Sequence, residues 1–155
     1  MEIREVKGNE YADAMEVAWH VFLKHNAPEY SLEGIQNFRK FLTDETLYKL
    51  FSMGEYRIFG FFDDTEKMEG MVSLRNKNHI SLLFVDDSFR ERGIGTKLLN
   101  YLCYYCWGYE GQNEVTVNSS PYAADFYRKY GFTDTGDIQQ SDGITFIPMK
   151  YELNG

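Results

Sequence analysis

The stretch from His79 to Leu99, HISLLFVDDSFRERGIGTKLL, constrains the fold more than any other part of the chain. It begins with a nearly continuous apolar run, Ile80 to Val85, which is typical of a strand covered on both faces. Two aspartates follow, and then Gly93 and Gly95 stand at the start of an apolar helical pattern. A helix N-terminus exposes unpaired N–H groups, and glycines there let an anion approach them. The stretch therefore predicts a phosphate-binding site between a strand and a helix.

The rest of the chain predicts a single domain that mixes helices and strands. Apolar stripes with helical spacing follow Asn9 and Ser31, which we expect to cap two helices. From Tyr56 onward the pattern changes to short strands joined by polar turns, which lead into the stretch above. Another strand, NEVTV, then feeds a helix that ends at Gly131, and a final pair of strands follows. Two successive strand-to-helix units predict two adjacent parallel strands, so residues 1–155 are expected to form one α/β domain.

Charge and composition narrow the class of partner. The net charge of −8 argues against general nucleic-acid binding, which needs a basic face, and fits a cationic or neutral partner. The apolar runs are too short to span a bilayer, and the start, MEIREVKGNE, lacks the pattern of a signal peptide. We interpret Cys103 and Cys106 as half-buried thiols in a reducing cytoplasm, because this pair lacks the second ligand pair that a zinc site needs. We therefore expect a cytoplasmic protein with no metal and no membrane partner.

The predicted phosphate site does not fit either of two common nucleotide-binding motifs. A Walker loop ends in Gly-Lys-Ser/Thr, whereas Gly95 is followed by Thr96 and then by Lys97. A dinucleotide fingerprint needs a third glycine at the position where Leu98 stands. What remains to be explained is the loop from Arg90 to Gly95, with the sequence RERGIG.

This loop resembles the Arg/Gln-x-x-Gly-x-Gly/Ala motif of the GNAT superfamily of acetyl-CoA-dependent N-acetyltransferases. The strand before it ends in LLFV, which resembles the fourth strand of that family. The segment from Ala123 to Phe132, AADFYRKYGF, is similar to the family signature A-x-x-F-Y-x-x-x-G-F. The similar parts extend from Tyr56 to Leu153, whereas the amino-terminal helices match only loosely.

The resemblance implies both a fold and a cofactor. The fold is a mixed, mostly antiparallel sheet of about six to seven strands flanked by helices, in which the parallel fourth and fifth strands splay apart. The pantothenate arm of coenzyme A would pair with the backbone of Phe84 and Val85, so we expect the fourth strand to lose its pairing after Val85. The pyrophosphate would lie on the backbone N–H groups and side chains of one loop, namely Arg90, Arg92, Gly93, Ile94, Gly95 and Thr96.

Two further positions take their predicted roles from the resemblance. Many family members carry an asparagine where this chain has Ser120, so we expect Asn118 or Ser120 to make that contact with the cofactor. Tyr127 matches the family tyrosine that protonates the departing thiolate. A phenol that is held close to the sulfur can donate that proton.

The base and the acceptor contacts are less well defined by the sequence. His79 at the start of the fourth strand and Ser81 within it are the candidates for accepting a proton from the amine. The ordinary pKa of histidine suits that task, although the position favours His79 as a turn residue at a strand entry. Glu29 and Tyr30 lie where the family places its acceptor loop, and we expect them to hold a cationic amine.

Taken together, these inferences predict an enzyme that moves an acetyl group from acetyl-CoA to a primary amine of a small molecule, by direct attack in a ternary complex. Two alternatives stay open: a non-catalytic acyl-CoA-binding or sensing module, and an acetyltransferase for protein N-termini or lysines. An open groove would favour a protein substrate, and a closed pocket would favour a small amine. An aromatic run predicts either a homodimer interface or a helix packed on the sheet: Tyr101, Tyr104, Tyr105, Trp107 and Tyr109.

Overall fold

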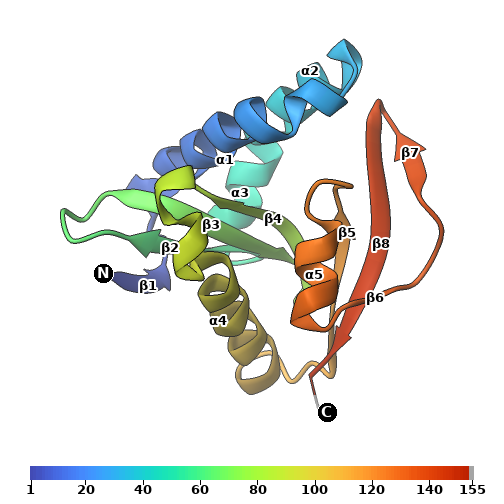
Figure 1. Cartoon of the computed structure of the whole chain (residues 1–155). Helices are drawn as coiled ribbons and strands as arrows, with labels where there is room; N and C mark the ends of the chain where they lie inside the picture. The colour runs from blue at the N-terminus through green and yellow to red at the C-terminus, as the bar shows by residue number, and fades with distance from the viewer. Residues whose placement is uncertain (154–155) are drawn as a thin grey trace.

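A computed structural model describes residues 1–153 of the chain, apart from the side chains of residues 90 and 91 (Figure 1). Its strands are β1 (Glu2–Glu5), β2 (Tyr56–Phe62), β3 (Met68–Arg75), β4 (His79–Val85), β5 (Glu114–Ser119), β6 (Thr133–Asp134), β7 (Gln139–Ser141) and β8 (Ile144–Glu152). Its α-helices are α1 (Tyr11–His25), α2 (Leu32–Leu42), α3 (Glu45–Ser52), α4 (Ile94–Gly108) and α5 (Ala124–Tyr130). Short 3-10 helices are η1 (Gly8–Glu10), η2 (Ala27–Glu29) and η3 (Asp87–Arg92). None of these helices has the length and apolar character needed to cross a membrane.

The strands form a mixed sheet in the order β1-β2-β3-β4-β5-β8-β6, and β7 pairs with β8 at its end. β4 and β5 run parallel, whereas the other paired strands run antiparallel. The prediction of a mostly antiparallel sheet with parallel fourth and fifth strands is therefore confirmed. The described residues supply eight strands, more than expected, because the segment after α5 folds into three strands rather than two.

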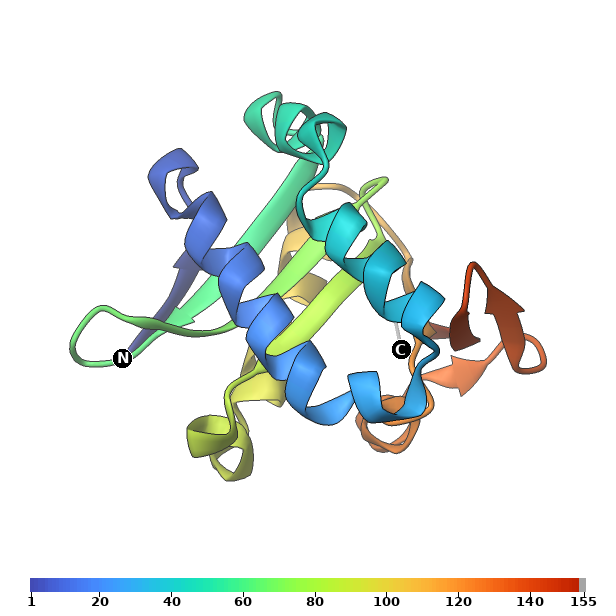
Figure 2. The ribbon, with the colours of Figure 1, turned by 90° about the horizontal axis from the view of Figure 1, so that it is seen from above.

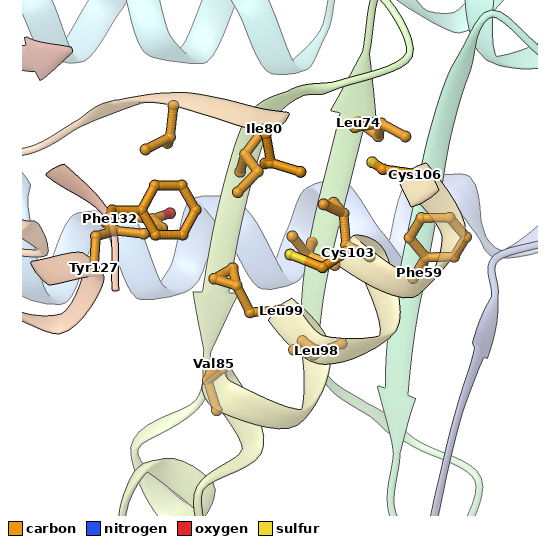
Figure 3. Packing of buried hydrophobic residues seen from close by; sticks show 14 of the residues in the cluster. Phe59, Leu74, Ile80, Val85, Leu98, Leu99, Cys103, Cys106, Tyr127 and Phe132 are labelled. Carbon is orange, nitrogen blue, oxygen red and sulfur yellow. The ribbon is translucent and has the colours of Figure 1, made fainter. Parts of the chain in front are cut away.

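Helices cover the sheet on both faces, and each face holds its own buried cluster. α1, α2 and α3 lie on one face, and α4 and α5 lie on the other (Figure 1, Figure 2). Leu98 and Leu99 of α4 are fully buried against β2, β3 and β4 (Figure 3). On the opposite face, Ala18 and Phe22 of α1 belong to a cluster with Met71 of β3. Because both faces are covered, the central strands read as continuous apolar runs in the sequence.

One of the two predicted helix caps is present, and the other is wrong. The hydroxyl of Ser31 accepts a hydrogen bond from the N–H of Gly34 at 3.1 Å, so Ser31 caps α2 as expected. Asn9 lies inside η1 and does not cap α1, which begins two residues later. The carboxylate of Glu10 explains the shift, because it accepts a bond from the N–H of Lys7 at 2.9 Å and pairs with Arg4 at 2.8 Å.

The parallel strands β4 and β5 stay together for only two residue pairs. His79 lies opposite Thr116 and Ile80 lies opposite Val117, after which the strands separate. The expectation that pairing ends after Val85 is wrong for this side of β4, although β4 does pair with β3 as far as Val85. The register with β3 shifts at Ser81, and such an extra residue bends a strand. The gap between β4 and β5 therefore begins after Ile80, whereas the sequence predicts that it begins after Val85.

Candidate active site

A cavity of about 1090 Å³ occupies the space that the splayed strands leave open. β4 lines it along its whole length, from His79 to Val85. The end of β5, the start of α4 and part of α5 line one end of the cavity, which we call the cofactor end. α1, α2 and the hairpin of β7 and β8 contribute to the other end, which we call the acceptor end.

The start of α4 gives the cofactor end its anion-binding character. Gly93 has φ +71°, in the left-handed region that favours glycine, and its carbonyl accepts the N–H of Lys97 at 3.0 Å. A Cβ on Gly93 would meet nothing within 4 Å, so the space in front of these N–H groups is open. A Cβ on Gly95 would lie 3.3 Å from the ring of Phe126, so a side chain there would press on α5. This geometry fits a pyrophosphate, because the first N–H groups of a helix have no partner within the helix.

The structure brings most of the predicted cofactor contacts into this one cavity. Those that line it are Phe84, Val85, Gly93, Gly95, Thr96, Asn118 and Ser120. Ile94 is buried beneath the loop, and Arg92 is exposed, with its guanidinium 5.3 Å from the centre of the Phe89 ring. The side chain of Arg90 lies outside the described part of the chain.

Ser120 and Asn118 differ in what else they do. The hydroxyl oxygen of Ser120 accepts the N–H of Ala123 at 3.2 Å, which fixes the turn that leads into α5. Its own proton stays available to an acceptor. Asn118 is exposed at the end of β5, opposite Pro148 of β8. Both residues therefore stay predictions for the contact that the family makes with asparagine.

Tyr127 reaches the cavity from α5 and is only 4% exposed. Its ring packs edge-on against Phe126 and Phe132, with centroids 5.4 and 5.2 Å away. Figure 3 shows Tyr127 beside Phe132. Burial raises the pKa of the Tyr127 hydroxyl above its ordinary value. The group is therefore protonated at neutral pH, which is the form that a proton donor needs.

His79 lies at the other end of β4 and also lines the cavity. Its Nδ1 is 2.8 Å from the hydroxyl of Thr116 on β5. Burial, with a smaller effect of the Arg75 charge, lowers the pKa of His79 to about 4. The ring is therefore neutral at physiological pH and can accept a proton, although a base with so low a pKa accepts it weakly.

Ser81 belongs to a small hydroxyl network in the sheet. The hydroxyl of the buried Tyr56 donates to Ser81 at 2.9 Å and lies 2.7 Å from the hydroxyl of Ser73. Ser81 lines the cavity at the bend of β4, so it is the member of the network that a ligand can reach. Ser81 keeps its place as a candidate for accepting a proton.

At the acceptor end, α2 touches the hairpin of β7 and β8. The side chain of Asn37 on α2 donates to the carbonyl of Asp142 at 2.8 Å, in the turn between β7 and β8. A Cβ on Gly34 would overlap the carbonyl oxygen of Gly143, so the two segments touch because both residues are glycine. Tyr30 lines the cavity below this contact, whereas Glu29 is exposed and is not among the lining residues.

A sequence signal for this hairpin did exist. Asp142 and Gly143 both have positive φ, +54° and +79°, and they join two paired strands. Asp-Gly between two strand-like runs is the usual signature of such a two-residue hairpin. Its contact with α2, however, depends on tertiary packing that no local pattern predicts.

Two further observations, on the thiols and on metal ligands, bear on the chemistry of the site. Cys103 and Cys106 are free and buried in α4, outside the cavity lining, and burial raises the pKa of these thiols to about 11 and about 12. Among the residues that the structure describes, no three His, Cys, Asp or Glu side chains gather in a way that could hold a metal ion.

Known structures share this fold. A GCN5-related N-acetyltransferase from Rhodopseudomonas palustris superposes with a TM-score of 0.82 at 21% identity, covering 97% of this chain and 94% of that one. The PaiA N-acetyltransferase from Thermoplasma acidophilum in complex with coenzyme A gives a TM-score of 0.76 at 22% identity, over 97% and 98% of the two chains. An aminoglycoside 6'-N-acetyltransferase complexed with coenzyme A gives 0.67 at 15% identity, over 100% and 98%. The fold is therefore that of a GNAT N-acetyltransferase.

The sequence itself supports the same class. The family model described as an acetyltransferase (GNAT) domain matches residues 26–153. The chain therefore belongs to the GNAT acetyltransferase family. A search among curated protein sequences finds no significant match.

Proposed function

We propose that the chain transfers an acetyl group from acetyl-CoA to the primary amine of a small molecule, by direct attack in a ternary complex. The observation that carries this proposal is one continuous cavity, which joins the N-terminus of α4, the gap between β4 and β5, and Tyr127. Both substrates can then meet within the same space without either leaving it.

The cofactor end fits coenzyme A in charge and in shape. The N–H groups at the start of α4 suit a pyrophosphate, and the edge of β4 from Ser81 to Phe84, which lies beyond its two residue pairs with β5, suits an amide-containing arm. Two structural neighbours are complexes with coenzyme A, which supports the same assignment here.

A small acceptor is favoured over a protein because α2 and the hairpin of β7 and β8 touch at the acceptor end. The contacts of Asn37 and Gly34 with the Asp142–Gly143 turn join these two segments at the acceptor end, which narrows the space for an extended peptide. Structural neighbours include an aminoglycoside acetyltransferase and a spermidine N-acetyltransferase chimera, both named for small amines. These names support an amine acceptor but do not choose one.

Each residue has a definite task in the proposed reaction. Acetyl-CoA supplies the acetyl group as a thioester, which the neutral amine attacks at the carbonyl carbon. Tyr127 donates its proton, or a hydrogen bond, to the departing thiolate, whose conjugate acid has a pKa near ~8.5, as for cysteine. The raised pKa of the Tyr127 hydroxyl makes full proton transfer less favourable. His79, acting through water, takes the proton that the amine loses. Its low pKa limits this contribution, so part of the deprotonation falls to solvent.

Direct attack is favoured over a covalent acetyl-enzyme by the position of the thiols. Cys103 and Cys106 are buried away from the cavity, and their raised pKa values keep them as weakly nucleophilic thiols. Two free thiols also fit a reducing compartment, and we propose the cytoplasm.

The proposal is tested by following thiol release from acetyl-CoA while both substrate concentrations are varied. A ternary-complex mechanism predicts double-reciprocal lines that intersect, and an acetylated amine that mass spectrometry detects. Parallel lines would instead indicate a covalent intermediate. If coenzyme A raises the unfolding temperature but no amine in a broad panel releases thiol, the chain is an acyl-CoA-binding module instead.

A further inference from the structure

The acceptor end of the cavity is lined by an aromatic wall. The apolar side chains at this end come from α1, α2, β4 and β8: Phe22, Phe38, Phe41, Phe84, Ile144 and Phe146. The rings of Phe22 and Phe38 stack with centroids 4.0 Å apart, and the ring of Phe84 stands edge-on to Phe38 at 5.9 Å. These three rings therefore support one another and present a fixed apolar surface to the cavity.

Ile144 and Phe146 contribute to the opposite side of this space, from β8. Among the described residues, neither side chain packs against the buried clusters, whereas Ile147 and Met149 on the other face of the strand do. Strand alternation places Ile144 and Phe146 together on the cavity side. A half-buried phenylalanine that supports no core contact gains burial when an apolar ligand covers it, so this pair is suited to hold a ring.

The charged groups that line the cavity suit a carboxylate better than a polycation. Among the described lining residues, Asp142 is the one carboxylate and Arg75 is the one permanent cation. Arg75 makes no ion pair with any described residue. It lies beside His79 in the register of β3 with β4. A guanidinium holds a carboxylate through two parallel N–H bonds, whereas a polyamine needs several carboxylates.

We propose that the acceptor is a primary amine that carries an aromatic ring and a carboxylate, as an aromatic amino acid does. The ring lies between the aromatic wall and Phe146, and the carboxylate pairs with Arg75. This inference rests on the proposed acetyl transfer and names the substrate class for it.

The carboxylate contact is tested with phenylalanine and phenethylamine, which share a ring and a primary amine and differ in the carboxylate. The wild type should acetylate phenylalanine with the higher kcat/KM. Arg75→Gln should lower the kcat/KM for phenylalanine, relative to the kcat/KM for phenethylamine, about tenfold or more, because a charge-assisted pair is lost. Lys77→Gln is the matched control, since Lys77 is a cation of the adjacent turn that does not line the cavity. It should leave the ratio unchanged.

The ring contact is tested by comparing phenylalanine with alanine as acceptors. Phe146→Ala should lower the preference for phenylalanine about tenfold, because the ring loses an apolar partner. Tyr104→Ala serves as the control, because Tyr104 is 67% exposed on α4 and lies outside the cavity lining. It should keep the wild-type preference.

Three other outcomes separate the failure of this inference from the failure of acetyl transfer. Faster acetylation of spermidine or kanamycin than of phenylalanine, unaffected by Arg75→Gln, overturns the substrate class and leaves acetyl transfer standing. If no amine is acetylated, the unfolding temperature of the coenzyme A-loaded protein decides. If phenylalanine raises the unfolding temperature of the wild type but not of Arg75→Gln, the binding site for the aromatic amino acid is supported and the proposed acetyl transfer is overturned. No rise and no turnover with phenylalanine overturn the substrate class.

Discussion

Tyr127 illustrates how a single residue acquires its role from its surroundings. Its ring is held between Phe126 and Phe132, and burial keeps its hydroxyl protonated at the wall of the cavity. The sequence predicts this residue because the helix that carries it has a local signature. His79 is different, because its low pKa depends on burial beside β5, which the sequence of β4 does not reveal. Arg75 could not be predicted either, since it reaches the cavity only through the register of β3 with β4.

The proposed role of Tyr127 leads to a prediction about Tyr127→Phe. The change removes one hydroxyl and keeps the ring packing, so kcat should fall about 10²-fold while coenzyme A still raises the unfolding temperature. Tyr130→Phe is the matched control on the same helix. Its hydroxyl bonds to Asn100 at 2.6 Å, outside the cavity, so its kcat should stay near that of the wild type. Full activity of Tyr127→Phe at every pH would contradict the role of proton donor.

At the scale of elements, the sequence predicts which strands separate but not where they do so. The apolar run of β4 and the motif at α4 predict a parallel pair with a gap. The register shift at Ser81, which places the start of the gap, comes from pairing between β3 and β4. The shape of the acceptor end likewise depends on α2 meeting the hairpin of β7 and β8, two segments far apart in the chain. Local patterns describe single elements, and these two features arise between elements.

The contact between α2 and the hairpin can be tested with Gly34→Ala. A methyl group would overlap the carbonyl of Gly143 and push the hairpin away, so the KM for the acceptor should rise about tenfold. Alanine is favoured over glycine within a helix by about 1 kcal/mol, so the helix itself is not weakened. Steady-state kinetics measures the effect.

Gly108→Ala is the matched control for this variant. Gly108 is a helical glycine of α4, and a Cβ there would make only an ordinary contact, 3.9 Å from the Tyr104 ring. Its KM for the acceptor should equal that of the wild type. An unchanged KM in Gly34→Ala would show that the hairpin contact does not shape the acceptor site.

At the scale of the whole molecule, the net charge of −8 is a poor guide to the acceptor. It indicates a cationic or neutral partner, yet Asp142 is the one carboxylate among the described lining residues. The acidic residues therefore lie mainly outside the cavity, where they act on solubility rather than on recognition. The exposed aromatic residues of α4 and of its C-terminal cap include Tyr104, Trp107 and Tyr109, and dimerisation through them stays a prediction.

The stability of the whole molecule should depend on pH through His79. Its pKa is about 4 in the folded chain, whereas an unperturbed histidine, as in the unfolded chain, has a pKa of 6.5. Between these two values the unfolded chain binds a proton that the folded chain does not. Stability from this group is present above pH 6.5 and is lost as the pH falls through the window to about 4. Denaturant unfolding of His79→Gln should show a smaller decrease over that window than the wild type. Equal slopes in the two proteins would contradict the burial of a neutral ring.

The most direct measurement is the crystal structure of the chain with coenzyme A. We predict that the pyrophosphate lies on the N–H groups of Gly93 to Thr96, the pantothenate arm between β4 and β5, and the sulfur beside the hydroxyl of Tyr127. Coenzyme A bound elsewhere, or an arm that does not enter the gap between β4 and β5, would contradict this prediction.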